Sequence, residues 1–212
     1  MSPALGHRRA GPRPRRRWPL LLVLFLLVTG CADHHRFPIR YEDRPGQHKY
    51  PLTATSAYGA SVVVKSPGMP YTASVIVSET GRDTAHLIKV EPIAHSANLE
   101  VIGTSAAGPH RHFGQAIGSH GYPPADLPKP ARTGYRPIDE VPVRPDDPKR
   151  PLGVDVLMGV RYQTGTRAWF DGIRVTYRVG DQTYIGDFPV SWAMCDEQPC
   201  EMPDYGSPWG PA

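Results

Sequence analysis

The sequence predicts an all-β protein, a single immunoglobulin-like antiparallel β-sandwich that follows a cleaved signal peptide. Apolar and polar residues alternate in several short stretches from residue 54 onward, and a period of two places successive side chains on opposite faces of a strand. No stretch after Cys31 shows the 3.6-residue apolar period of a helix. Proline makes up 25 of the 212 residues, well above its usual share of about 5%, and proline breaks helices.

The first 30 residues predict a lipoprotein signal peptide. Six arginines and no acidic residue precede an apolar run at 18–32, whose length suits a signal-peptide core better than a membrane-spanning helix of about 20 residues. The run contains Val28-Thr29-Gly30-Cys31, which resembles the bacterial lipobox. The resemblance implies lipidation of the Cys31 thiol and cleavage just before it. A plain signal peptide and an uncleaved anchor helix remain alternatives.

Removal of the signal peptide changes the charge of the protein. The whole chain has a formal charge of +4, but six of its 24 Lys and Arg precede Cys31, whereas its 20 Asp and Glu all follow it. The mature chain therefore carries 18 basic and 20 acidic residues, a net charge of −2. This balance gives no support for a nucleic-acid partner. We expect an extracytoplasmic protein attached to the cell membrane through lipid on Cys31.

The first half of the mature chain predicts a tether followed by a run of strands. Residues 31–50 are polar and aperiodic, as expected of a tether that leads to a sandwich domain at 51–194. This domain begins with four candidate strands, at 54–65, 71–78, 85–93 and 98–103. The polar turn ETGRDT separates the second strand from the third, which is typical of an antiparallel hairpin.

The middle of the chain, at 104–150, has the highest density of proline. Loops of this length are uncommon in compact domains and are often functional. We expect a long surface crossover with one short edge strand near 141–143. Its paired acids, Asp139-Glu140 and Asp146-Asp147, are interpreted as solvated turn residues, because catalytic carboxylates need a partly buried setting.

The last third carries the strongest alternation, in three candidate strands at 152–162, 172–179 and 183–192. In the middle strand, Arg174, Thr176 and Arg178 face outward, opposite the apolar side chains of Ile173, Val175, Tyr177 and Val179. Gly180-Asp181 predicts the turn into the last strand, in which Pro189 indicates an edge position or a bulge. About seven or eight strands without helices between them are typical of a sandwich, although the Cys–Trp–Cys spacing of antibody domains is absent.

Cys195 and Cys200 are the two cysteines that remain after Cys31. Exported proteins meet an oxidising environment, so we expect a short disulfide that begins the C-terminal segment 195–212. The spacing differs from the C-x-x-C of thioredoxin-like enzymes, and the chain has no second cysteine pair for zinc. A redox or metal pair and free thiols remain alternatives.

Three segments in a fixed order carry a family resemblance: VSETGRDTAHLIKVEPI, then GYPPADLP, then LMGVRYQTGTRAWFDGIRVTYRVGDQTYIGDFPVSW. The set, within residues 71–192, resembles a group of exported or membrane-anchored proteins of high-GC Gram-positive bacteria. The resemblance implies a single sandwich domain outside the membrane. The group supplies no activity, so no catalytic residue is carried over to this chain.

The segment HRHFGQAIGSH contains the candidate metal ligands His110, His112 and His120. A His-x-His pair on a strand points both imidazoles to one face, and imidazole suits copper and zinc. The alternative is three solvated loop histidines. A second candidate surface is the aromatic pair Trp169-Phe170 at a strand connection, which either forms a binding patch or braces the end of the sandwich.

The remaining chemistry favours binding over catalysis. The chain has no G-x-S-x-G elbow, no phosphate-binding glycine loop and no H-E-x-x-H motif. The sequence therefore predicts a non-enzymatic cell-envelope lipoprotein, without a cofactor, whose sandwich is a binding or accessory module. Its expected partners are the membrane and another envelope protein. A copper- or zinc-binding envelope protein and a hydrolase with an unrecognised site in 104–150 are the alternatives.

Overall fold

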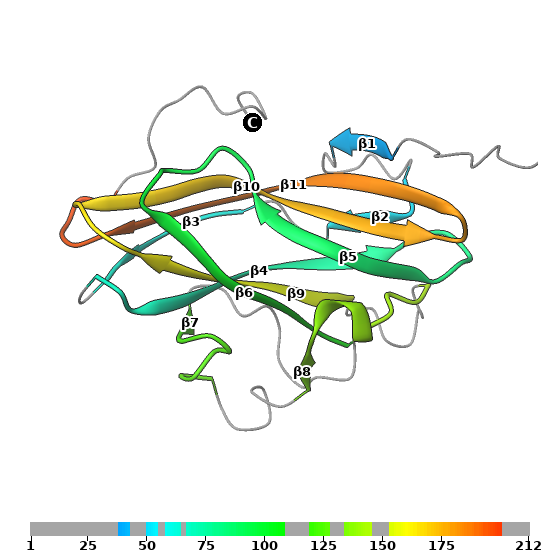
Figure 1. Ribbon diagram of the computed structural model, residues 1–212, viewed down its shortest axis with the longest axis horizontal. Coiled ribbons are helices and arrows are strands. Elements are labelled where there is room, and N and C mark those ends of the chain that lie inside the picture. The colour runs from blue at the N-terminus through cyan, green and yellow to red at the C-terminus, as the bar shows by residue number, and fades with distance from the viewer. Residues whose placement is uncertain are drawn as a thin grey trace, which may run out of the picture. The chain divides into compact units, whose positions relative to one another are not determined.

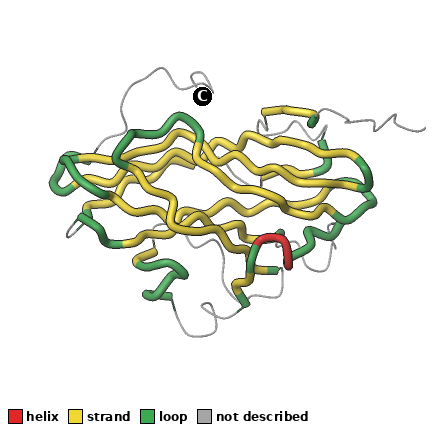
Figure 2. Tube along the Cα trace, in the orientation of Figure 1, coloured by secondary structure: helices red, strands yellow, loops and turns green. Residues whose placement is uncertain are grey.

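The computed structural model describes residues 38–42, 50–54, 58–64, 67–108, 119–127, 134–145 and 153–200. These residues form strands β1 to β11 and one short 3-10 helix, η1 (Ile138–Glu140). The strands build two sheets that pack face to face (Figure 1). Strand dominates the described chain, and η1 is its helical turn (Figure 2). The prediction of an all-β protein with two packed sheets is confirmed, and immunoglobulin topology stays a prediction.

Sheet A has the strand order β1-β11-β10-β5, and β3 also pairs with β11. Its long central strands β10 and β11 form the hairpin expected through Gly180-Asp181. The short strands β1 and β3 both run parallel to β11, along different parts of the same edge. The sandwich is therefore not purely antiparallel. The strands are β1 (Ile39–Glu42), β3 (Tyr58–Val63), β5 (Ala85–Pro92), β10 (Arg167–Val179) and β11 (Gln182–Cys195).

Sheet B has the strand order β2-β4-β9-β6-β8, and β7 also pairs with β4. Its centre is the antiparallel trio β4, β9 and β6, and β7 and β8 lie below this trio in Figure 1. The strands are β2 (Leu52–Ala54), β4 (Pro70–Glu79), β6 (Leu99–Ala107), β7 (Ser119–His120), β8 (Tyr135–Arg136) and β9 (Val154–Tyr162).

The expected hairpin between 71–78 and 85–93 is wrong. The first segment lies in β4 of sheet B and the second in β5 of sheet A, so the turn between them crosses from one layer to the other. Alternation identifies the buried face of each strand, but it does not identify the sheet to which the strand belongs. The next connection returns the chain to sheet B, where β6 continues to Ala107 rather than ending near Gly103.

The core lies between the sheets and contains the apolar residues that alternation placed on the inner faces. Valine is the commonest core residue of sheet B, which also buries Tyr71 and Tyr162, and the long hairpin of sheet A contributes Phe170, Tyr177, Phe188 and Trp192. Fully buried examples are Val75, Val156, Met158, Val160, Ile173, Val175, Tyr177, Phe188 and Trp192.

The predicted surface crossover at 104–150 contributes to the fold more than expected. Ile138, Val141 and Val143 are buried in the main core, and the expected edge strand near 141–143 is a single bridge between Val143 and Ala85 of β5. The two residues exchange backbone N–H···O bonds of 2.9 Å. This part of the crossover therefore closes one edge of sheet A instead of lying free on the surface.

The outer face of sheet B is buried as well, because the crossover also passes over it. Tyr122 follows β7, and its ring lies so close to Gly159 that a Cβ atom there would come within 2.3 Å of the ring. Gly103 on the neighbouring strand meets the same ring. The Thr72 hydroxyl donates a 2.6 Å hydrogen bond to the Gly121 carbonyl and holds the segment in place. Outward-facing Ser74, Asp155 and Leu157 are buried as well.

The interval predicted as a tether, 31–50, contains strand β1. Tyr41 of β1 points into the sandwich, and its hydroxyl donates to the Leu52 carbonyl of sheet B over 2.7 Å. The Tyr177 hydroxyl lies 2.7 Å from the Tyr41 oxygen and accepts a 3.2 Å bond from the Leu52 N–H. Because each hydroxyl has one proton, Tyr177 donates to Tyr41 and the three groups form a closed ring of hydrogen bonds.

Substitution of Gly159 by alanine tests the contact with Tyr122. The added methyl group has no room under the ring, so we expect the free energy of unfolding to fall by about 1–3 kcal/mol, as in other overpacked sites. Urea unfolding of the full chain in neutral detergent measures the change. Gly108→Ala is the control, because no atom lies within 4 Å of the position that a methyl group would occupy there. An equal loss in a Tyr122→Ala background would contradict the proposed contact.

Substitution of Tyr177 by phenylalanine tests the hydrogen-bonded ring. The change leaves the buried Leu52 N–H without its acceptor, and we expect a loss of about 1–3 kcal/mol in the free energy of unfolding. Tyr184→Phe is the matched control, because this ring stacks on Tyr177 but its hydroxyl takes no part in the ring of hydrogen bonds. Equal unfolding midpoints for the two variants would show that the ring contributes nothing.

Candidate functional site

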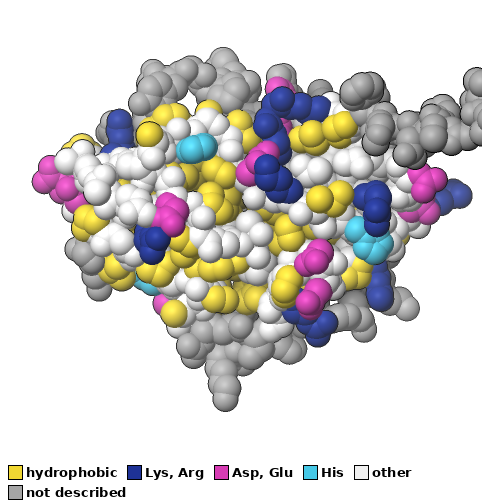
Figure 3. Space-filling model, viewed as in Figure 1, with side chains coloured by type: hydrophobic (Ala, Val, Ile, Leu, Met, Phe, Trp, Pro, Cys, Tyr) yellow, Lys and Arg dark blue, Asp and Glu magenta, His cyan; other side chains and the backbone are white. Residues whose placement is uncertain are grey.

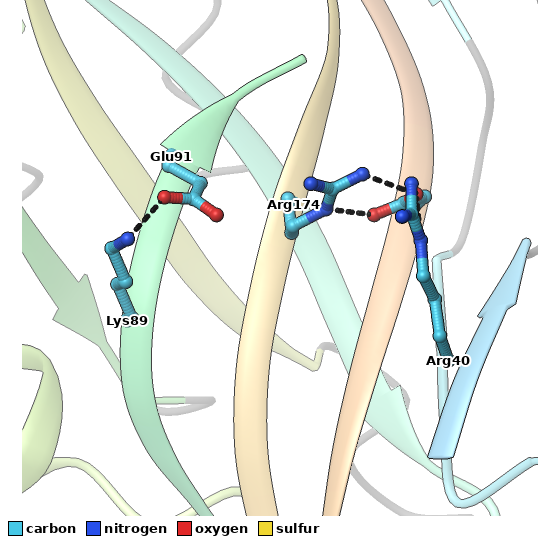
Figure 4. Close-up of polar contacts among 5 residues, drawn as sticks. Arg40, Lys89, Glu91 and Arg174 are labelled. Carbon is cyan, nitrogen blue, oxygen red and sulfur yellow. Dashed lines mark hydrogen bonds and ion pairs between the residues drawn. The ribbon is translucent and has the colours of Figure 1, made fainter. Parts of the chain in front are cut away.

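The outer face of sheet A carries a compact cluster of charged side chains. Arg174 of β10 and Asp187 of β11 are register partners and share this face, and Arg40 of β1 reaches the same carboxylate (Figure 4). Arg174 Nε lies 2.6 Å from Asp187 Oδ1, and its Nη2 lies 2.8 Å from Oδ2. Arg40 donates to Oδ2 through Nε at 3.2 Å and Nη2 at 2.8 Å.

The cluster holds its carboxylate in the ionised form. The Asp187 side chain is only 4% exposed, and burial alone would raise its pKa. Hydrogen bonds from Arg174 and Arg40, together with their positive charges, outweigh burial and lower the pKa of Asp187. The pKa of Arg174 is raised, chiefly by its hydrogen bond to Asp187. The cluster therefore ties three strands of sheet A together with matched charges.

A second ion pair continues this pattern on β5. Lys89 and Glu91 are paired with each other on the same outer face, as Figure 4 shows. Glu91 is the register partner of Arg174, so Arg174 lies between two acidic side chains across three strands. The charges in the middle of this face are thus satisfied within the protein. A partner would have to displace these contacts in order to use them.

The end of the same face beside the β10–β11 turn is hollowed. An open pocket of about 440 Å³ is lined by Thr84, His86, Arg178, Gly180 and Asp181. His86 and Arg178 are register partners on neighbouring strands and both are exposed. Figure 3 shows histidine, basic and acidic side chains gathered toward the right-hand end of the view, where Figure 1 places the β10–β11 turn. The pocket combines two nitrogen donors with one carboxylate.

The opposite end of the face carries a small apolar cluster and a disulfide. Cys195 and Cys200 form the expected disulfide and pack with Ala193 against partly buried Val63 and Trp169. Of the two aromatics at 169–170, Phe170 is fully buried in the core. This arrangement favours the interpretation that the aromatic pair braces this end of the sandwich.

The candidate metal ligands fall only partly within the described residues. His110 and His112 lie outside them, as does the candidate lipidation site Cys31. His120 forms part of β7, where its ring lies 5.0 Å from the Tyr71 ring and its backbone N–H donates to the Asp126 carboxylate. Within the described ranges, no group of three or more His, Cys, Asp or Glu side chains is placed to hold a metal ion.

Alternation alone could not identify the charged cluster or the pocket. It placed Arg174 and Arg178 on the outer face, which the structure confirms by their exposure relative to the buried neighbours. Alternation does not identify Asp187 or Arg40 as cluster residues, because their contacts depend on strand register and on the pairing of β1 with β11. The sequence signal for the cluster is a pair of opposite charges at outward positions of two adjacent strands, Arg174 on β10 and Asp187 on β11.

We compared the chain with protein-family models, curated proteins and solved structures. No family model matches the chain, and neither a curated protein nor a solved structure shows a significant match. In the described part of the chain, no helix has the length and apolar character needed to cross a membrane. Any function proposed for the protein therefore depends on the residues of the chain itself.

Substitution of Asp187 by asparagine tests the cluster. We expect the free energy of unfolding at pH 7 to fall by about 1.5–3 kcal/mol, because charge-assisted hydrogen bonds to two arginines are lost. Glu91→Gln is the control on the same face; its exposed ion pair with Lys89 should contribute about 0.5 kcal/mol or less. Urea unfolding of the full chain measures both.

The pH dependence gives an independent check. The folded pKa of Asp187 lies below the value of 3.8 for an ordinary aspartate, so its stabilisation is complete above about pH 4 and decreases as the pH falls toward the folded pKa. The difference between wild type and Asp187→Asn should therefore shrink below pH 4. A difference that stayed constant from pH 7 to pH 2 would contradict an ionised Asp187.

Proposed function

We propose that this protein is a cell-envelope lipoprotein that holds an immunoglobulin-like β-sandwich outside the membrane as a binding or accessory module. Lipid on Cys31 attaches it to the membrane, and the mature chain begins at that residue. The lipobox-like sequence at 28–31, its cationic leader and the resemblance to exported sandwich proteins of high-GC Gram-positive bacteria support this proposal. It acts by binding rather than by catalysis.

The observation that carries the proposal is the firm attachment of β1, which begins eight residues after Cys31. Eight extended residues span roughly 30 Å at most. Inside the sandwich β1 is held by Tyr41, and on the outer face it is held by Arg40. A lipid on Cys31 would therefore keep the domain close to the membrane surface, instead of allowing it to move on a long tether.

The face available for binding is the outer face of sheet A. Its mixed charges and open pocket are accessible, whereas the outer face of sheet B is buried under the segment that contains Tyr122. Binding proteins commonly use such polar faces and the loops beside them. The partner that best suits the proposal is another component of the envelope.

Metabolic labelling with an alkyne analogue of palmitate tests the attachment. We expect wild type to incorporate the label and Cys31→Ala to lose it, with the mature wild-type N-terminus found at Cys31 by mass spectrometry. Cys200→Ala is the control, because it removes a different cysteine and leaves the lipobox intact. Equal labelling of wild type and Cys31→Ala would refute the lipoprotein proposal.

A further inference from the structure

The charged side chains in the middle of the outer face of sheet A are paired with one another. Arg40, Arg174, Lys89, Glu91 and Asp187 are all engaged in ion pairs on the outer face. Among the residues that the structure describes, the side chains of His86, Arg178 and Asp181 form neither an ion pair nor a hydrogen bond. These three side chains surround the same hollow.

The strand register places the two nitrogen donors side by side. His86 and Arg178 are directly opposite each other on β5 and β10, and such partners on one face have Cβ atoms about 5 Å apart. Two cationic or donor groups at this spacing repel each other when both are charged, and an anion between them removes the repulsion. A guanidinium binds a phosphate group through two parallel hydrogen bonds. Thr84 adds a hydroxyl to the same hollow.

The third group of the pocket restricts the ligand further. Asp181 lies in the β10–β11 turn and contributes a carboxylate to the lining. A carboxylate repels a bare phosphate, but it attracts an ammonium group a few ångströms away. A ligand that carries a phosphate and an amine together satisfies all three side chains. The pocket volume of about 440 Å³ is within the range of small-molecule sites.

The pocket lies at the end of sheet A where the chain enters β1. Ile39, the first residue of β1, pairs with Tyr184 of β11, and Tyr184 pairs with Tyr177 of β10. The adjacent row across the sheet contains Thr183, Arg178 and His86. Strands are about 4.8 Å apart, so the pocket is roughly 15 Å from the start of β1. If Cys31 is lipidated, the anchor joins the chain eight residues before this end of the sandwich.

We propose that the pocket formed by His86, Arg178 and Asp181 binds the phosphate and amine of an aminophospholipid headgroup in the membrane that carries the anchor. Arg178 and His86 hold the phosphate, and Asp181 holds the ammonium group. The inference that the headgroup belongs to a membrane lipid rests on the proposed lipid attachment at Cys31. The inference that the pocket recognises phosphate and amine rests on the residues of the pocket alone. The bound headgroup fixes the orientation of the sandwich on the membrane.

Titration of the full chain in a neutral maltoside detergent with phosphoethanolamine, inorganic phosphate or ethanolamine tests the recognition by calorimetry. We expect phosphoethanolamine to bind at least about fivefold more tightly than phosphate, and Arg178→Met to weaken both about tenfold or more. Asp181→Asn should remove the preference for phosphoethanolamine while phosphate binding is kept. Lys89→Met, which removes a positive charge from the same face but outside the pocket, should bind like wild type.

The result that overturns the recognition is equally specific. Absence of saturable phosphoethanolamine binding by wild type would refute it, as would equal losses in Arg178→Met and Lys89→Met. An unchanged preference in Asp181→Asn would also refute it. The substituted positions are all exposed, and far-ultraviolet circular dichroism with the urea midpoint confirms that each variant is folded. Because Asp181→Asn changes specificity rather than affinity for phosphate, it separates ligand contact from general loss of structure.

The source of the headgroup is tested with the lipidated protein in vesicles. Carbodiimide coupling of an amine to Asp181, read by mass spectrometry, should be slowed in vesicles that contain phosphatidylethanolamine relative to phosphatidylcholine alone. If Asp181 is coupled equally in both kinds of vesicle while phosphoethanolamine still binds in detergent, the headgroup of a membrane lipid is not the ligand. The pocket would then be assigned to a soluble phosphate ester. If wild type incorporates no palmitate label but still binds phosphoethanolamine, the lipid anchor is refuted and the recognition of phosphate and amine by the pocket is not.

Discussion

The hydroxyl of Tyr41 forms the contact on which the arrangement of this protein depends. It joins β1 of sheet A to the Leu52 carbonyl of sheet B, and Tyr177 closes the ring from β10. The aromatic rings around it add packing, since Tyr50 stacks on Tyr41 and Tyr184 stacks on Tyr177. Burial raises the pKa of Tyr177, so its hydroxyl stays protonated and able to donate. The N-terminal strand is therefore fixed to both layers.

The two sheets have different outer surfaces, and the ring of Tyr122 contributes to the difference. Tyr122 lies against Gly103 and Gly159, and any side chain at these positions would displace it. The segment around Tyr122 also accepts a hydrogen bond from Thr72 of β4, a residue at an outward-facing position. Sheet A keeps an accessible outer face.

The charged side chains of the open face fall into two sets. Asp187 is almost inaccessible and bound by two arginines, which suits a contact that fastens β1, β10 and β11. Arg178, His86 and Asp181 lie around a hollow at the sheet end. Each set includes an outward-facing arginine of β10, so residue type and face do not distinguish Arg174 from Arg178. The difference arises from register, since Asp187 lies opposite Arg174 whereas Arg178 lies opposite His86.

By itself, the sequence determined the strand content, the inner faces of β9, β10 and β11 and the β10–β11 turn, and it favoured the pairing of Cys195 with Cys200. These features follow from local alternation, turn residues and cysteine count, which act over a few residues. Only the tertiary structure decided that β4 and β5 belong to different sheets, that β1 returns to β11, and that Tyr122 covers sheet B. The charged cluster and the pocket depend on these decisions, because each joins residues far apart in the chain whose register local patterns do not specify.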